Sequence, residues 1–358
     1  MNSSRPIDQQ LQNLLLALAY PQSKHHLVVL PYLGYGSRQI VYLHGHSLKN
    51  PRTSRTTTDD SRWRNSLNGF HRFSTREVPH VEIEIEFENL QRVIETDDTG
   101  YFDMRLDLTK PLAENHQTPE AHFRLSHQPD TDIIGKAIVP PSNAEFGVIS
   151  DLDDTVIRTQ VNYRLRMLWN TFAHNAHTRK PVQGVAEFYR GLQTGLSNTR
   201  NPFFYVSSSP LKLYGFTLEF FKKHDIPVGP LLMRNIAVQG LFHLHKPPKM
   251  EHKLKYIGRI LTLYPDLPFI LIGDNGELDA EIYLEIVKQY PNQVSTIYVH
   301  EVEKSPEHQA RIAQIQQEVE TLGVEFQLVQ NNLHAAEHAS ARGYIQPNVL
   351  DKIRKLDF

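Results

Sequence analysis

Gly147-Val148-Ile149-Ser150-Asp151-Leu152-Asp153-Asp154-Thr155 is a short apolar run followed at once by carboxylates. Val148 and Ile149 predict a buried strand that delivers Asp151 and Asp153 into the turn at its carboxyl end, where open α/β sheets place their chemistry. Carboxylates at this spacing can converge on one Mg²⁺, a hard cation that prefers oxygen ligands. The other interpretation is an acidic surface turn, so the motif needs partners elsewhere in the chain.

The D-x-D-x-T spacing also supplies the two groups needed to hydrolyse a phosphate ester in steps. One carboxylate can attack phosphorus and form an aspartyl-phosphate, which divides the reaction into two easier steps. A neighbouring carboxylic acid can protonate the departing alkoxide. The stretch therefore predicts phosphoryl chemistry, provided that other strands bring the missing groups.

A second apolar run ends in hydroxyl groups. Residues 203–206 predict a strand that leads into Ser207, Ser208 and Ser209. Hydroxyls and free backbone N–H groups at a helix start form a natural cradle for phosphate oxygens. The alternative for this segment is a helix cap or a serine turn.

A third apolar run ends in further carboxylates. Residues 268–272 predict a strand that delivers Asp274, which could complete a metal site with Asp151. Asp279 follows at the start of the next predicted helix. Support of the metal and capping of the helix are equally expected for Asp279.

A lysine stands between the second and third runs. Lys253 directly precedes the apolar helical pattern of residues 254–261. An ammonium group near the nucleophile would offset the charge that develops during phosphoryl transfer. A lysine at a helix start can equally be solvated surface, and Lys246, Lys249 and Lys255 are nearby competitors.

The part of the chain before residue 140 has a different pattern. Four apolar residues at positions 81, 83, 85 and 87 alternate with glutamates, which predicts a strand with one buried and one solvated face. Further short strands are predicted at residues 27–30, 39–44, 92–95, 101–106, 122–126 and 134–139. Such a series predicts an antiparallel β-sandwich, interrupted by a long polar loop at residues 47–74.

Pro140-Pro141-Ser142-Asn143 predicts a linker, and strands alternate with helices after it. Additional strands are expected at residues 294–299 and 324–329, and a helix between Ser305, as N-cap, and Gly323. This alternation predicts a parallel sheet covered on both faces. The resulting division is an N-terminal helix at 1–24, a β-sandwich accessory domain at 25–142 and a catalytic domain at 143–358.

Composition sets broad limits on function. The 358 residues are 40% hydrophobic and 22% charged, as in globular proteins of about two domains. A net charge of -2 argues against a nucleic-acid-binding protein, which needs a basic surface. The absence of cysteine excludes disulfides and thiolate chemistry. No apolar run approaches the ~18 residues of a membrane span, so a cytoplasmic protein is expected.

The four motifs together resemble the active site of the haloacid dehalogenase superfamily, whose catalytic domain is a Rossmann-like parallel α/β sheet. The segments S-D-L-D-D-T-V, F-Y-V-S-S-S-P, H-K-L-K-Y-I-G-R-I-L and L-I-G-D-N-G-E-L-D are more specifically similar to the catalytic domain of the actin-patch type of phosphatidate phosphatase. The likeness begins at about Phe146 and extends to the C-terminus, including residues 338–345. The family usually has Ser, Gln and Pro where this chain has Asn275, Glu277 and Ala280.

The resemblance implies a Mg²⁺-dependent phosphatase that converts phosphatidate to diacylglycerol. It implies that Asp151 is the nucleophile, that Asp153 is the general acid with its carbonyl facing the metal, and that Lys253 bridges nucleophile and phosphate. The remaining implied residues are Ser207 and Ser208 for phosphate, Thr155 for the turn and substrate, and Asp274 and Asp279 for the metal.

Several alternatives remain open at this stage. The same mechanism could serve a soluble phosphomonoester, or the chain could be an adaptor that binds a protein partner through its β-sandwich. Residues 158–180 mix basic and aromatic residues, which suits a membrane-bound anionic lipid, a cap over a soluble phosphate or a plain covering helix. An uncharged amphipathic helix at residues 7–18 favours packing on protein over peripheral membrane contact. A zinc site at His243, His245 and His252 explains fewer residues than one Mg²⁺ site.

Overall fold

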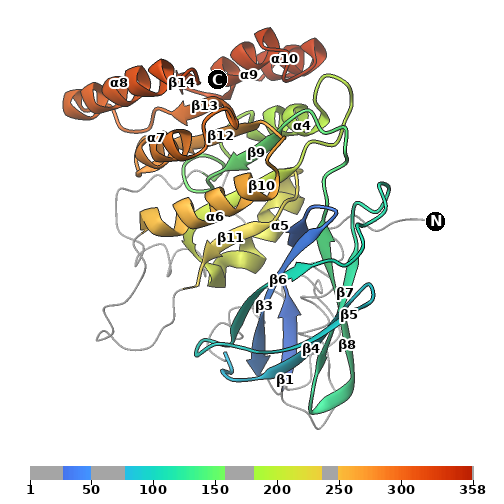
Figure 1. Cartoon of the computed structure of the whole chain (residues 1–358). Helices are drawn as coiled ribbons and strands as arrows, with labels where there is room; N and C mark the ends of the chain where they lie inside the picture. Colours follow the sequence, from blue (N-terminus) through green and yellow to red (C-terminus); the bar gives the residue numbers. More distant parts are fainter. Residues whose placement is uncertain (1–26, 50–76, 158–180, 236–248, 357–358) are drawn as a thin grey trace, which may run out of the picture. The chain divides into compact units, whose positions relative to one another are not determined.

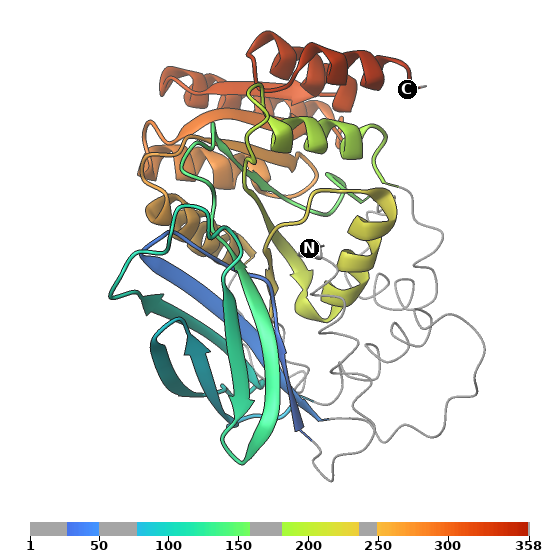
Figure 2. The same cartoon turned by 90° about the vertical axis from the view of Figure 1, so that its right-hand side faces the viewer.

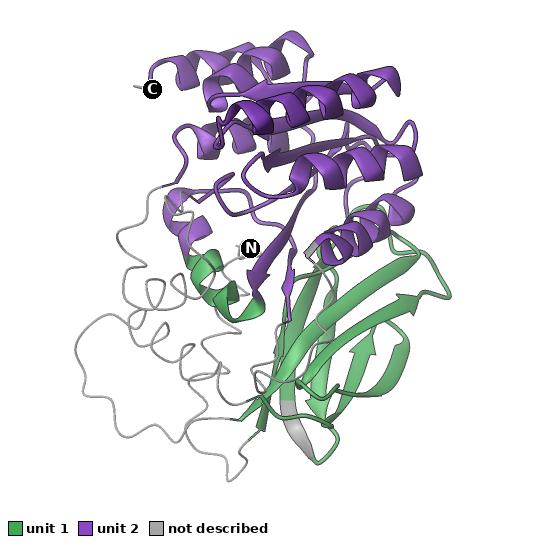
Figure 3. Cartoon of the chain, turned by 90° about the vertical axis from the view of Figure 1, so that its left-hand side faces the viewer, with its two compact units in different colours: residues 1–139, 211–219 green, residues 140–210, 220–358 purple. Residues whose placement is uncertain are grey.

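The computed structural model describes residues 27–49, 77–157, 181–235 and 249–356. These residues form two compact units, of which unit 1 contains residues up to Val139 together with Leu211–Glu219, and unit 2 contains Pro140–Pro210 and Phe220 onward (Figures 1 and 3). The predicted N-terminal helix, most of the polar loop after residue 49 and the basic segment 158–180 lie outside the described residues. None of the described helices has the length and apolar character needed to cross a membrane.

Unit 1 contains a sheet of eight strands that is antiparallel except where β2 pairs with β8. Its strands are β1 (Leu27–Pro31), β2 (Gly34–Gly36), β3 (Ile40–Lys49), β4 (Glu82–Phe87), β5 (Leu90–Glu95), β6 (Tyr101–Asp107), β7 (Glu120–Leu125) and β8 (Gln128–Ile138). The antiparallel pairing predicted from sequence is therefore confirmed, and the sandwich of two packed sheets stays a prediction. The parallel pair was not predicted, because β2 has only three residues and two of them are glycine.

The alternation on β4 has the consequence expected from sequence. Ile83, Ile85 and Phe87 are buried and their neighbours Glu82 and Glu84 are exposed. The buried residues join one apolar core with side chains from other strands of the sheet, among them Val41 of β3 and Phe102 of β6. Unit 1 is stabilised mainly by burial of this core.

Unit 2 is built on a parallel sheet of six strands in the order β11-β10-β9-β12-β13-β14. The strands are β9 (Gly147–Ser150), β10 (Phe203–Pro210), β11 (Leu231–Arg234), β12 (Phe269–Asp274), β13 (Val294–His300) and β14 (Glu325–Val329). Every residue of β9, β10 and β12 is buried, because helices cover both faces of the sheet. The predicted mixed α/β architecture with a parallel sheet is confirmed.

The helices of unit 2 form two groups (Figures 1 and 2). One face of the sheet is covered by α6 (Lys249–Leu263), α7 (Asp279–Gln289) and α8 (Pro306–Thr321), and the other by α4 (Val185–Thr194), α9 (Asn332–Ala341) and α10 (Pro347–Arg354). A further helix, α5 (Tyr214–His224), follows β10 after the short 3-10 turn η1 (Leu211–Leu213), and its residues up to Glu219 belong with η1 to unit 1.

The helix predicted after Ser305 is α8. It ends as expected, because Gly323 has a φ of +82°, a conformation that glycine adopts without strain. Ser305 occupies the N-cap position as predicted, although its side chain makes no capping hydrogen bond. Its hydroxyl therefore contributes nothing to the first turn, where Pro306 supplies the fixed φ that starts the helix.

Candidate active site

The candidate site lies where the order of the parallel strands reverses. The chain proceeds from β9 outward through β10 and β11, and then restarts on the other side of β9 with β12. Strand β9 therefore pairs with both β10 and β12, so the carboxyl ends of all three strands lie side by side. Ligands of open α/β sheets bind at such a switch point.

The turn after β9 presents the first two carboxylates. The Asp151 backbone N–H donates to the Ile272 carbonyl at 2.9 Å, which extends the pairing of β9 with β12 by one residue. Asp154 has a φ of +51°, a left-handed conformation that aspartate tolerates better than most residues. This tight turn separates the buried carboxylate of Asp151 from the partly exposed Asp153.

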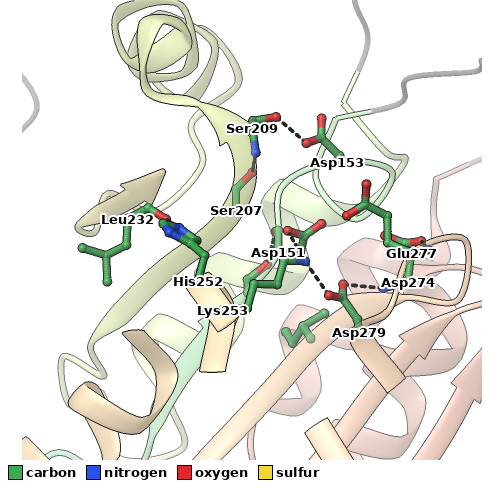
Figure 4. A network of polar contacts seen from close by, with 12 residues as sticks. Asp151, Asp153, Ser207, Ser209, Leu232, His252, Lys253, Asp274, Glu277 and Asp279 are labelled. Carbon is green, nitrogen blue, oxygen red and sulfur yellow. Dashed lines mark hydrogen bonds and ion pairs between the residues drawn. The ribbon is translucent and has the colours of Figure 1, made fainter. Parts of the chain in front are cut away.

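Lys253 supplies a buried cation. Its Nζ lies 2.9 Å from Asp151 Oδ1 and also contacts Asp279 Oδ1 (Figure 4). Burial lowers the pKa of Lys253, but the charges of Asp151 and Asp279 outweigh burial and raise it above its ordinary value. The alternative of a solvated lysine is therefore excluded, and the predicted place at the helix start is wrong, since Lys253 is the fifth residue of α6.

Three carboxylates converge beside this lysine. One oxygen each from Asp151, Asp274 and Asp279 lies within 4.8 Å of the others. Among the described residues, Asp151 Oδ2 and Asp274 Oδ2 are buried and have no hydrogen-bond partner. Buried oxygens without donors are costly, so this arrangement fits a site for a hard cation such as Mg²⁺.

The electrostatics of the three carboxylates support the same conclusion. Burial is the largest cause that raises the pKa of Asp151, Asp274 and Asp279, and their mutual repulsion raises the pKa of Asp151 and Asp274 further. Lys253 opposes this rise with one positive charge. A divalent cation between the carboxylates would offset the remaining negative charge.

Asp279 holds the other groups in place. It is the first residue of α7, and Leu278 occupies the N-cap position without a side-chain cap. Asp279 Oδ2 accepts from the Asp274 backbone N–H at 3.3 Å, while Oδ1 contacts Lys253. A Cβ on Gly273 would lie 2.5 Å from Asp279 Oδ2, so only glycine allows this approach. Of the two expected roles, capping of the helix is not observed.

The serines at the end of β10 face the same turn. Figure 4 shows Ser207 and Ser209 at the end of β10, on the side that faces the turn with Asp151 and Asp153. Ser207 Oγ accepts from the Ser209 backbone N–H at 3.0 Å, and Ser209 Oγ donates to Asp153 Oδ2 at 2.5 Å. Ser208 Oγ is buried without a hydrogen-bond partner among the described residues. The contact of Ser209 with Asp153 was not predicted from sequence.

The loop after β12 brings a further carboxylate. Gly276 and Glu277 donate their backbone N–H groups to Asp274 Oδ1 at 2.6 and 3.1 Å. The Glu277 side chain is partly exposed, and its charge contributes to the raised pKa of Asp153, Asp274 and Asp279. Sequence comparison with the family singled out position 277 as a departure, but gave no reason to place it in the site.

The remaining predicted residues divide into three cases. Thr155 is buried in the turn, and its Oγ1 has no hydrogen-bond partner among the residues that the structure describes. His252 is buried and donates from Nε2 to the Leu232 carbonyl at 3.1 Å, and burial lowers its pKa to about 4. His243 and His245 lie outside the described residues. His252 thus links α6 to β11, and its lowered pKa favours the uncharged ring.

Comparison with known proteins yields matches to part of this chain. Residues 146–301 match the family described as "Phosphatidate phosphatase APP1, catalytic domain". Phosphatidate phosphatase APP1 of Saccharomyces cerevisiae is 32% identical over 155 residues, which make up 43% of this chain and 25% of that protein. An uncharacterized protein of Schizosaccharomyces pombe is 28% identical over 158 residues, or 44% of this chain and 25% of that protein. The match spans a quarter of the length of each of these relatives.

Solved structures add no argument. A carbohydrate acetylesterase from Xanthomonas citri aligns with 80% of this chain and 72% of its own at 9% identity, with a TM-score of 0.26, which is too low to support a conclusion.

The match to the family covers all four motifs and ends at residue 301, before the expected closing segment 338–345. Residues 146–301 of this chain are therefore similar to the family described as "Phosphatidate phosphatase APP1, catalytic domain".

Proposed function

We propose that this protein hydrolyses a phosphate monoester by way of an aspartyl-phosphate on Asp151, and that its substrate is phosphatidate. The observation that carries the proposal is the meeting of Asp151, Asp274 and Asp279 within 4.8 Å around the ammonium of Lys253. No purely structural role explains why a fold would bury three carboxylates against one cation, since each buried charge costs several kcal/mol before pairing. Functional sites are where such costs are tolerated.

The chain's own side chains supply the nucleophile and the general acid of the proposed reaction. A carboxylate oxygen of Asp151 bonds to phosphorus while the bond from phosphorus to the leaving oxygen breaks, and Asp153 gives that oxygen a proton. In the second step, Asp153 takes a proton from water as the water oxygen attacks phosphorus, which releases phosphate and restores Asp151. Lys253 holds Asp151 in position, and Ser207 and Ser208 offer hydroxyls to the phosphate oxygens.

The electrostatic state of Asp153 suits this double role. Burial is the first cause that raises its pKa above the ordinary value, while the hydrogen bond from Ser209 opposes the rise. A raised pKa keeps part of the Asp153 population protonated closer to neutral pH, as a general acid requires. Asp151 must act as a carboxylate, and the contact with Lys253 favours that form.

We infer that Asp151, Asp274 and the Asp153 carbonyl hold Mg²⁺, with Asp279 supporting Lys253 and Asp274 from behind. When bound, the ion would offset negative charge on the transferring phosphoryl group and on the carboxylates. The two buried oxygens without partners, Asp151 Oδ2 and Asp274 Oδ2, support this assignment.

We assign unit 2 to the haloacid dehalogenase-like fold and residues 143–358 to the catalytic domain. The doubly wound strand order and the position of the motifs at the ends of β9, β10 and β12 support the assignment. We further propose that residues 25–142 are an accessory domain with a protein partner, and that the protein works in the cytoplasm with peripheral membrane contact at its substrate.

The test is hydrolysis of phosphatidate in vesicles against a panel of soluble phosphomonoesters, with Mg²⁺ and with chelator. We expect release of phosphate from phosphatidate that depends on Mg²⁺. Activity on the soluble esters alone would replace phosphatidate with a soluble substrate and keep the mechanism. No hydrolysis of either class, together with binding of a protein to residues 25–139, would favour the adaptor function.

A further inference from the structure

The motifs do not explain the contact that Ser209 makes in the site. Its hydroxyl donates to Asp153 Oδ2 at 2.5 Å. Among the described residues, no other side chain hydrogen bonds to the Asp153 carboxylate. We propose that Ser209 is a positioning residue that orients Asp153, so that Oδ1 delivers the proton to the leaving alkoxide. This inference rests on the proposed function and assigns a residue that sets the geometry of its acid step.

The two partners differ in how firmly the fold holds them. Ser209 is only 4% exposed and lies in β10, whose register with β9 pairs Phe203, Phe204 and Tyr205 with the residues before the turn. Its backbone N–H is also fixed by Ser207 Oγ at 3.0 Å. Asp153 lies in a turn and is partly exposed. The hydrogen bond from Ser209 in the strand therefore restricts the rotation of the Asp153 carboxylate in the turn.

Chemistry assigns different roles to the two oxygens of Asp153. A hydroxyl that donates to Oδ2 makes Oδ2 the acceptor, so the acidic proton resides on Oδ1. When the bond from phosphorus to the leaving oxygen breaks, its electron pair stays on that oxygen and the Oδ1 proton moves to it. The negative charge left on Asp153 is then stabilised by the donor at Oδ2. In the second step the same carboxylate accepts a proton from water.

Leaving groups of different quality separate this role from a merely structural one. The alkoxide of diacylglycerol needs a proton as it departs, whereas 4-nitrophenolate is a stable leaving group without one. We expect Ser209→Ala to lower kcat on phosphatidate vesicles by about 10- to 100-fold, a part of the 10²–10⁴-fold that a general acid contributes. Hydrolysis of 4-nitrophenyl phosphate should fall less than about 3-fold, and KM for either ester should change little.

Two comparisons complete the design. Ser209→Thr keeps the hydroxyl and should restore most of the activity on phosphatidate. Asp153→Asn should show the same selective loss, and Ser209→Ala added to it should cost nothing more, because a positioning residue acts only through its partner. Ser295 provides a matched control, since its hydroxyl donates to the Phe269 carbonyl at 3.1 Å at the opposite end of the sheet. Ser295→Ala should leave both activities unchanged.

Equal losses on the two esters in Ser209→Ala would overturn the inference, as would a further loss in the Asp153→Asn background. If Ser209→Ala unfolds at the assay temperature, Ser209→Cys preserves the volume and supplies only a weak donor. That variant should lose activity on phosphatidate selectively, and full activity in it would contradict the role of the hydrogen bond. If the unaltered protein hydrolyses neither ester, the proposed function itself fails, which is a distinct result.

Discussion

Both units carry sets of carboxylates, and the two sets are in opposite physical environments. In unit 1, Glu82 and Glu84 alternate along the solvent face of β4. In unit 2, Asp151, Asp274 and Asp279 are 2%, 2% and 0% exposed. Water solvates the first set at little cost, whereas the second set depends on Lys253 and on each other's protonation state.

The type of sheet explains this difference. In an antiparallel sheet with one solvated face, alternation sends polar residues outward along the whole strand. In a parallel sheet covered on both faces, the strands are apolar throughout and polar residues appear where they end. The buried carboxylates of unit 2 therefore lie together at one edge of the sheet, where they can act on one ligand. The glutamates of β4 are spread along the strand and do not point toward one ligand site.

The largest effect should come from the nucleophile. We expect Asp151→Asn to lower phosphatase activity by more than about 10³-fold, because the amide cannot form the phosphoryl bond. Glu84→Gln on β4 should leave activity unchanged. Phosphate release from phosphatidate vesicles measures both, and circular dichroism checks that each variant is folded. Substantial turnover in Asp151→Asn would exclude Asp151 as the nucleophile.

The strands of both units could be predicted because their patterns are strong. The alternation of β4 and the continuous apolar runs of β9 and β12 follow directly from the faces that these strands bury. Strand β11 was missed because four residues are too few to show a period. The resemblance placed a closing segment at residues 338–345, but the start of α9 at Asn332 was not predicted, because alanine-rich segments bury a face without a strong apolar contrast.

Two features of the candidate site were beyond sequence reasoning. The apolar period of α6 becomes visible only at residue 254, so Lys253 was predicted before the helix. Its place beside Asp151 was expected from the family resemblance, but its contact with Asp279 was not predicted. The contact of Ser209 with Asp153 depends on the register of β10 beside β9. Register follows from the packing of the whole sheet, and a motif read along one chain does not contain it.

The next largest effect concerns stability. Lys253→Met keeps the length of the side chain but leaves Asp151 and Asp279 without their cation, which should destabilise unit 2 by about 3–5 kcal/mol. Arg124 in unit 1 is the matched control, because it lies 2.8 Å from Glu86 in a half-exposed pair. Arg124→Met should cost less than about 1 kcal/mol. Calorimetry with separate transitions for the two units measures both, and similar losses would remove the contrast between the sites.

Metal binding should distinguish the two sets of carboxylates without any assay of activity. Mg²⁺ at a hundredfold excess over its Kd should stabilise unit 2 by about 2.7 kcal/mol, seen as a rise in its melting temperature. Asp274→Asn should lose most of this rise. Glu84→Gln should keep it, since exposed glutamates hold no site. An unchanged melting temperature of the unaltered protein in Mg²⁺ would contradict the proposed metal site.

The smallest predicted effect is a dependence of stability on pH, and it concerns a buried base in unit 1. Burial is the main cause that lowers the pKa of His46 to about 4, with Lys212 and His44 acting in the same direction and Asp97 against it. The unfolded chain takes up the proton near pH 6.5. Between these values the unfolded state binds more protons, so stability falls as pH falls, by about 1.4 kcal/mol per pH unit.

In the variant His46→Asn, the stability of unit 1, measured by calorimetry, should fall less between pH 7 and pH 5 than in the unaltered protein, whatever the effect of the variant at neutral pH. The exposed residue His80 gives the opposite sign, because its hydrogen bond with Glu95 raises its pKa and adds stability as pH falls. In His80→Asn, the stability of unit 1 should therefore fall more steeply over the same pH range. If His46→Asn leaves the dependence of stability on pH unchanged, a group other than His46 controls the acid sensitivity of unit 1. Burial of a titratable side chain would then not explain the difference between the two environments.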